Sequence, residues 1–152
     1  MESVVVKVSQ ALASIAYVGP FDTTANVSRA YQWREPLTMI AERMYVTVVP
    51  VNWIEDDEDR DSDTDKVSCA VAFLAKPKDP DDVEQIDEII RTFQVNVNRL
   101  RDLSGKDLPG LDAAFIDAKP QGIVDLDMLR ERSVCLAWAS VDVWVNRSRC
   151  DA

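Results

Sequence analysis

Histidine is absent from this chain of 152 residues, and glycine is scarce, with four residues in all. The lack of histidine excludes the usual general bases, serine–histidine triads and most zinc sites. The four glycines form neither of the phosphate-binding patterns GxGxxG and GxxxxGK[ST]. We therefore expect a protein that is not an enzyme, that holds no metal and that binds no cofactor.

Cysteine is also rare, and long hydrophobic runs are missing. The three cysteines have no CxxC spacing, and Cys69 and Cys135 lie inside strand-like runs, so we expect reduced core residues. Cys150, near the end of the sequence, is expected to be an exposed thiol without a role. No stretch approaches 18 apolar residues, and residues 1–15 lack the pattern of a secretion signal. These absences predict a soluble protein made in the cytosol, with no membrane partner.

Negative charge is abundant. Twenty-seven acidic residues against seventeen basic ones give a formal charge of -10, which opposes general adhesion to nucleic acid or anionic lipid. Hydrophobic residues make up 47% of the chain, which predicts a folded globule instead of a disordered tail. The length favours a single domain over residues 1–152.

The most informative segment runs from Met44 to Ala75. It reads as a strand, MYVTVVPV, a stretch NWIEDDEDRDSDTD, and a second strand, KVSCAVAFLA. Eight carboxylates lie between Glu55 and Asp65. A plain hairpin turns in about two to five residues, so the sequence predicts an acidic hairpin loop, about residues 52–66, on a pair of strands that projects from the body.

Apolar spacing predicts two helices. Apolar residues recur at intervals of three and four between Val4 and Ala16. A longer helix is expected from Asp79, as N-cap, with Pro80 at the first helical position, to the Ser104-Gly105 pair. Its expected core stripe consists of Val83, Ile86, Ile89, Ile90, Phe93, Val97 and Leu100.

Period-two alternation predicts the strands. The expected strands cover residues 27–33, 44–51, 67–75, 113–118 and 132–146. Between them we expect a turn or short helix at 37–42, a turn at 119–122 and a brief helix at 125–130. This order predicts an α+β fold: a mostly antiparallel sheet of about four to five strands, with the long helix and the N-terminal helix on one face.

Three interpretations of the acidic loop stay open. Asp61, Asp63 and Asp65 resemble the opening of a calcium loop, but Lys66 and Ala72 stand where glycine and glutamate are required, so only weak divalent binding is reasonable. The loop can also be a solvated segment whose charge prevents strands from associating edge to edge. In the third interpretation the loop becomes ordered against a neighbouring subunit.

Several phrases resemble a known family. The run ERMYVTVVP, the long polar hairpin, the strand KVSCAVAFLA, the helix opening DDVEQIDEIIRTF and the closing DMLRERSVCLAWASVDVWV are similar to the tail terminator or neck proteins of long-tailed bacteriophages. This resemblance covers about residues 1–146. It implies a structural virion protein, assembled in the host cytoplasm, that forms a ring, commonly of six copies. Such a ring caps the tail tube protein and joins it to the head-tail connector, and DNA is only cargo that passes through its lumen.

The candidate site residues follow from that setting. Trp53 is the first choice for a subunit contact, and the channel or interface carboxylates are Asp56, Asp57, Asp59, Asp61, Asp63 and Asp65. In a channel these charges would repel the phosphate backbone of DNA. Trp33, Trp138 and Trp144 lie on expected strands and serve either as core or as contact anchors. Alternatives are another neck, head-completion or tube protein of the virion, and an acidic metal-binding or DNA-mimic adaptor.

Overall fold

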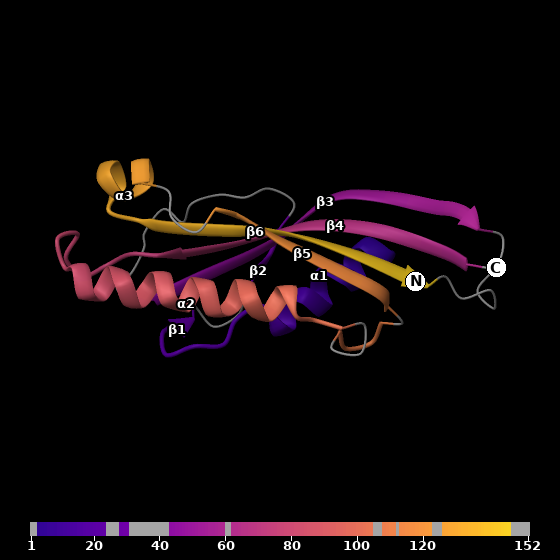
Figure 1. Ribbon diagram of the computed structural model, residues 1–152, viewed down its shortest axis with the longest axis horizontal. Helices are drawn as coiled ribbons and strands as arrows, with labels where there is room; N and C mark the ends of the chain where they lie inside the picture. Colours follow the sequence, from indigo (N-terminus) through magenta and orange to yellow (C-terminus); the bar gives the residue numbers. More distant parts are fainter. Residues whose placement is uncertain are drawn as a thin grey trace.

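One sheet organises the molecule (Figure 1). The computed structural model describes residues 3–23, 28–30, 43–59, 62–104, 108–111, 113–122 and 126–146. Within these ranges the fold is α+β, with four long antiparallel strands, as the sequence predicts. The expected turn or short helix at 37–42, most of the expected strand 27–33 with Trp33, and Cys150 lie outside the described residues.

The four long strands have the spatial order β3-β4-β6-β5, and each neighbouring pair is antiparallel. Their bounds are β3 Arg43–Asp59, β4 Ser62–Ala75, β5 Ala113–Gly122 and β6 Cys135–Asn146. Two strands of two residues, β1 (Asp22–Thr23) and β2 (Ser28–Arg29), pair in parallel with the first half of β3. The expectation that β4 is a central strand is confirmed, because it has a long neighbour on each side.

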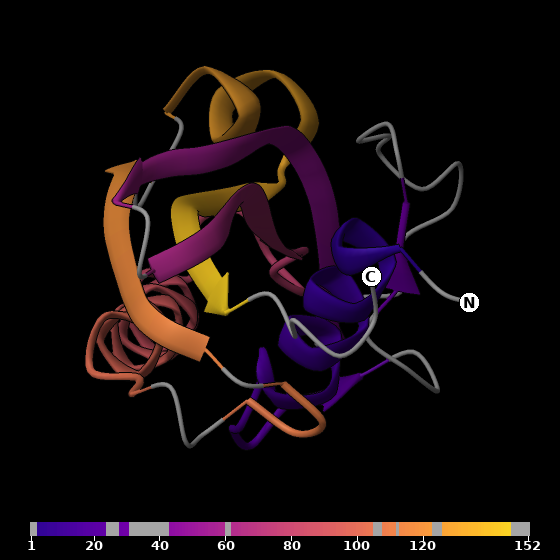
Figure 2. The ribbon, with the colours of Figure 1, turned by 90° about the vertical axis from the view of Figure 1, so that its right-hand side faces the viewer.

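Two helices cover the same face of this sheet. The helix α1 (Val4–Ile15) lies under β3 and β4, and α2 (Val83–Arg101) lies under β5 and β6. Figure 2 shows both on one side of the curved sheet, with the short helix α3 (Leu126–Arg132) on the other side. The N-terminal helix and the long helix are therefore packed on one face, as the sequence predicts.

The core lies between these two helices and the sheet. Every second residue of β4 from Val67 to Ala75 is fully buried there, and so is every second residue of β6 from Cys135 to Val143. The rings of Phe73 and Phe93 join sheet and helix, with centroids 6.2 Å apart. Cys69 and Cys135 are buried in this core, which confirms the prediction for both thiols.

A buried asparagine ties α1 to α2. The side-chain amide of Asn96 donates to the carbonyl oxygens of Val18 (3.0 Å) and Thr92 (2.9 Å), and its Oδ1 accepts from the Val18 amide (2.9 Å). Arg99 donates to the same Oδ1 (3.0 Å) and to the carbonyl oxygen of Ile15 (3.3 Å) at the end of α1. This network satisfies Asn96, so its burial with no exposed surface carries no unpaired polar group.

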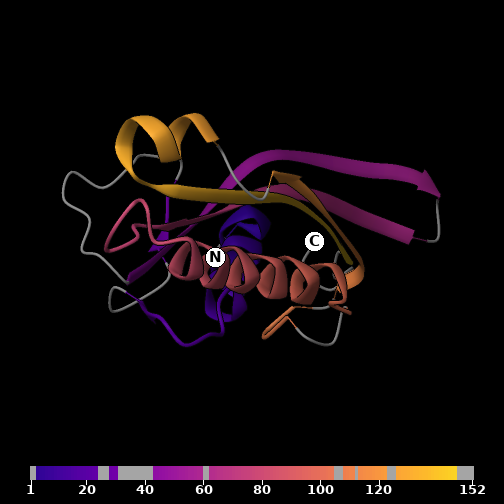
Figure 3. The same ribbon diagram turned by 60° about the vertical axis from the view of Figure 1, so that its left-hand side comes forward.

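The prediction of a loop at 52–66 is wrong for most of these residues, which form strands. The strand β3 continues to Asp59 and β4 begins at Ser62, with pairs as far out as Asp56 with Thr64 and Asp59 with Ser62. Ladder hydrogen bonds use the backbone only, so carboxylates do not prevent pairing where water can hydrate them. We call the distal half of this hairpin, residues 51–59 and 62–65, the arm. Figure 3 shows its tip reaching beyond the end of β6.

Other boundaries also differ from the sequence-based ones. The helix α2 begins at Val83, capped by the Asp82 carboxylate, which accepts from the Gln85 amide (3.2 Å). Asp79 instead accepts from the Asp81 amide (2.9 Å) in a preceding turn, so a local side-chain bond competes with the helix start. Val83 is consequently exposed and is not part of the core stripe.

The end of β5 and the start of β6 also differ from the bounds that the sequence predicts. Residues 119–122, expected as a turn, are the end of β5, where Pro120 is tolerated because the strand lies at the edge of the sheet. The helix α3 extends to Arg132, two residues beyond the prediction, and β6 starts later, at Cys135. Ser133, with a positive φ of 55°, makes the reversal between them, a conformation that apolar patterning does not reveal.

Candidate functional site

Within the described ranges, the second face of the sheet carries no long helix. Of the described helices only α3 packs on it, where Met128, Leu136 and Tyr45 contact a small cluster containing Ala72 and Leu74. The sequence predicts that β4 is at least partly covered on this face as well, and the packing of α3 over one end of the strand confirms that prediction. We call the side of the sheet that does not face α1 and α2 the open face.

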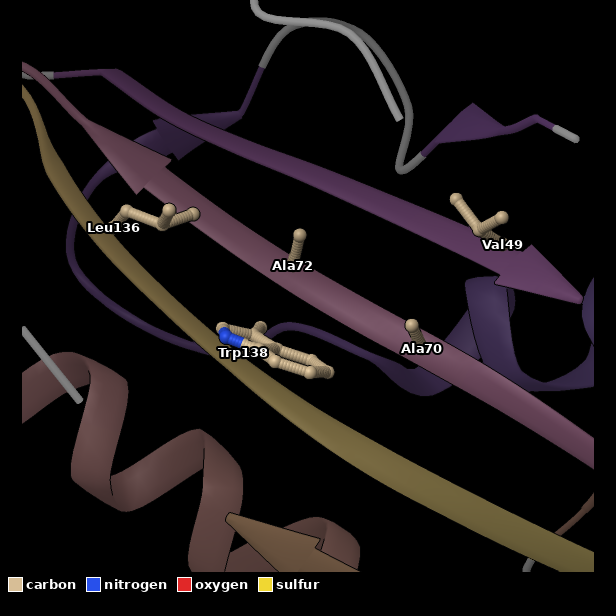
Figure 4. A pocket seen from close by; sticks show the side chains of 5 residues that line it. All are labelled: Val49, Ala70, Ala72, Leu136 and Trp138. Atoms are coloured by element: carbon tan, nitrogen blue, oxygen red, sulfur yellow. The ribbon is translucent and has the colours of Figure 1, made fainter. Parts of the chain in front are cut away.

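A shallow apolar groove lies on the open face beside α3 (Figure 4). It has a volume of about 260 Å³ and is lined by Val49, Ala70, Ala72, Leu136 and Trp138. Its position follows from the register: Val49 lies opposite Ala70, and Ala72 lies opposite Trp138. Two alanines on the central strand leave a trough between the larger side chains of β3 and β6, and the Trp138 ring, 41% exposed, forms one wall.

A row of larger side chains crosses the open face nearer the arm. The register aligns Ile54, Lys66, Trp144 and Phe115 across all four strands. The Trp144 and Phe115 rings lie 5.1 Å apart, and the Lys66 ammonium lies 5.2 Å from the centre of the Trp144 ring. Lys66 is also 3.9 Å from the Asp142 carboxylate. Ile54 and Phe115, at the two ends of the row, are exposed.

The arm exposes apolar side chains of its own. Trp53, the first candidate contact residue, is 48% exposed, and Val51 and Ile54 are exposed as well. Trp53 pairs with Val67 and so shares its face, the side of the sheet that α1 and α2 cover nearer the body. Ile54 pairs with Lys66 on the open face. The arm therefore presents a large apolar residue on each of its two sides.

The residues predicted to supply carboxylates belong to two strands. The backbone of Asp56, Asp57 and Asp59 belongs to β3 and that of Asp63 to β4, whereas Asp61 lies outside the described residues. The structure corrects the prediction for Asp65, which pairs with Val145 of β6 and is only 6% exposed. With so little exposed surface, this carboxylate does not present its charge to a channel, although its side chain lies on the same face of the sheet as the exposed Trp53.

Basic residues lie at the end of the sheet where α3 packs. Arg130 and Arg132 are exposed in the last turn of α3, and Arg43 and Lys76 lie at the neighbouring ends of β3 and β4. The acidic residues on α3 are Asp127 and Glu131. Among the described residues of α3 and of these two strand ends, four basic groups therefore stand against two acidic ones, in a protein whose overall charge is -10.

The buried thiols are poor nucleophiles. Burial raises the pKa of the Cys69 thiol to about 12, with a further contribution from the negative charge of Asp142, and burial raises the pKa of Cys135 to about 11. Both remain protonated at neutral pH, and it is the thiolate that reacts. They act as small apolar core residues.

Among the described residues, no group of three or more cysteine, aspartate or glutamate side chains has a geometry that could hold a metal ion. No helix within the same ranges is long and apolar enough to cross a membrane.

The comparisons with known proteins are negative. No protein-family model and no characterised protein matches this sequence. The surfaces described above therefore have to be interpreted from their own chemistry.

Sequence patterns revealed part of this candidate site. They singled out Trp53 and the acidic segment, which was expected as a loop, and they placed Trp138 on one side of the last strand. They missed Phe115 and the groove itself. The available signal was the pairing of small residues, Ala70 and Ala72, with a tryptophan on the same face, which leaves space on a sheet unless another layer fills it.

Proposed function

We propose that this chain is a structural virion protein similar to phage tail terminators, which closes into a ring, commonly of six copies, at the end of the tail tube. The ring would cap the tube, contact the connector below the head and allow DNA to pass through its lumen. The proposal is supported by the family resemblance of the sequence segments 42–75, 81–93 and 127–145, together with the surfaces of the fold.

One observation carries the proposal: a single chain exposes large apolar side chains on two unlike surfaces. The open face has a groove walled by Trp138, and the arm bears Trp53 on a different part of the sheet. Exposed tryptophans beside small apolar residues are typical of protein contacts. Two different patches on one subunit favour a heterologous, head-to-tail contact, which forms a ring when the rotation closes.

Native mass spectrometry of the purified chain tests this proposal directly. Six copies of the 17.1 kDa chain would give a closed species of about 103 kDa, alone or once tail tube protein is added. Long stacks of rings would instead indicate a tube subunit of the same virion. A protein that stays monomeric or dimeric in both conditions would contradict the ring.

A second measurement tests the position of the ring on the tail. Adding the protein to polymerising tail tube protein should stop elongation, because a capped end no longer offers the surface that the next tube subunit needs. Electron microscopy would show shorter tubes, each with one modified end. An unchanged length distribution at saturating protein would contradict the capping role while leaving ring formation open to the mass measurement.

A further inference from the structure

We infer that the groove of the open face receives the arm of a second copy of this chain, with Trp53 seated beside Trp138 and the acidic tip directed toward α3. The inference rests on the proposed ring and specifies its subunit contact. In this contact the arm of one copy binds the groove on the open face of the next copy.

Apolar complementarity is the first argument. Trp53 lies on the side of the arm that it shares with Val67, where α1 and α2 do not reach to cover it, and almost half of its surface is exposed. The groove offers a trough over two alanines with the Trp138 ring at its side. When the arm lies on the open face of the next copy, one contact covers both surfaces.

The arm cannot fill its own groove. The pairs from Val48 with Val71 to Asp56 with Thr64 hold β3 against β4, with one register shift between Pro50 and Asn52. At about 3.3 Å per residue, Trp53 lies more than about 10 Å along the strand from Val49 at the groove. Trp53 also belongs to the opposite side of the sheet. An arm that lies in this groove must therefore belong to another copy of the chain.

Charge complementarity is the second argument and sets the direction of the arm. Residues 55–59 of the arm are five consecutive acids. With Trp53 in the groove, this run is long enough to reach α3, because Ala72 lines the groove and also belongs to the cluster on which α3 packs. The basic residues of α3 are Arg130 and Arg132, and Arg43 and Lys76 lie at the neighbouring ends of β3 and β4. An acidic strand on a basic end steers association and fixes its register.

The edges of the sheet are poorer candidates for this contact. The distal part of β3 has register shifts at Pro50/Asn52 and Asp56/Asp59. The other edge strand, β5, has shifts at both ends and contains Pro120, which cannot donate to a ladder. Bulges, proline and charge are the devices that prevent strand addition at sheet edges. The described residues that line the groove of the open face include no proline and no charged side chain.

A mixing experiment tests the pairing. Trp53→Glu disables the arm, Trp138→Glu disables the groove, and Val95→Glu is the control, because Val95 is also 48% exposed but lies on α2 at the opposite face. Each of the first two variants alone should associate about thirtyfold more weakly or worse, whereas the control should assemble like the original chain. Circular dichroism checks that all three are folded.

The decisive sample is the equimolar mixture of the two disabled variants. The Trp138→Glu chain keeps an intact arm and the Trp53→Glu chain keeps an intact groove, so the mixture should form a 1:1 dimer and no ring. Folded variants that form no dimer on mixing would overturn the inference, and so would rings that both variants still form alone. In either case, ring formation by the original chain would still support the proposed function. An original chain that never assembles would contradict both the proposed function and this inference.

Neutralising the arm tests the charged half of the contact. The variant with Asp56, Asp57, Asp59 and Asp61 changed to asparagine should assemble more weakly, and added salt should weaken the original chain toward the same level. Arg130→Glu should have a similar effect from the receiving side. If rings of the neutralised variant form with unchanged affinity and only DNA release is slowed, the carboxylates face the channel and the assigned direction of the arm is overturned.

Discussion

The two faces of the sheet are built from the same strands but have different side chains. Toward α1 and α2, β4 and β6 present valines, Phe73 and two cysteines, all fully buried. Toward the open face the same strands present Ala70, Ala72, Ser140 and charged residues around two tryptophans. The covered face has its apolar complement within the chain, whereas among the described residues the open face has one only beneath α3. This difference indicates which face stabilises the fold, and under the proposed function the other face is the one that contacts a partner.

The largest expected effect comes from the covered face. Phe73→Ala removes a fully buried ring that packs against Phe93 and should lower the free energy of unfolding by about 3–5 kcal/mol. Urea titration measures the loss. A loss below about 1 kcal/mol would break the comparison, because the covered face would then not be the stabilising one.

The link between the two helices should show an intermediate effect. Asn96→Ala leaves the Val18 backbone groups and Arg99 without their buried partner, so we expect a loss of about 2–3 kcal/mol. The exposed neighbour Asn98, changed to alanine, is the matched control and should cost little. Equal losses for both variants in thermal unfolding would refute the role of the network.

The pH dependence of stability sharpens the comparison further. The pKa of Cys69 is raised from 9.0 to about 12 in the folded state, so the unfolded chain loses this proton first as pH rises. The contribution of this thiol to stability is fully present below pH 9 and is lost between pH 9 and 12. At pH 10 the loss is about 1.4 kcal/mol. The free energy of unfolding of Cys69→Ala should therefore decline less steeply with rising pH than that of the original chain over pH 8–10. Parallel curves would contradict this assignment.

The smallest effect on stability is expected on the open face. Trp138→Ala should change the unfolding free energy of the monomer by about 1 kcal/mol or less, because the ring is partly exposed. The measurement is a urea titration at a concentration where the chain does not associate, with Phe73→Ala as the reference. A loss as large as that of Phe73→Ala would mean that the open face is a second core.

The sequence could predict what depends on periodic burial. The helix stripe around Phe93, the alternation in β4 and the buried thiols are direct consequences of burial, so the layers of the fold follow from them. Patterning could not show that the acidic segment continues as strand, because an exposed ladder has no apolar face. It also missed that Asp79 serves a turn and Asp82 the helix cap. The groove depends on which strands become neighbours, and sequence order does not contain that information.

Hydroxyl-radical footprinting of the assembled and the dissociated protein tests the central claim most directly, namely that the open face is a subunit contact. The account predicts that Trp138 and Trp53 lose reactivity together when the ring forms, whereas Val95 on the outer side of α2 keeps its reactivity. An intact ring in which Trp138 reacts as fast as it does in the dissociated chain would contradict the account.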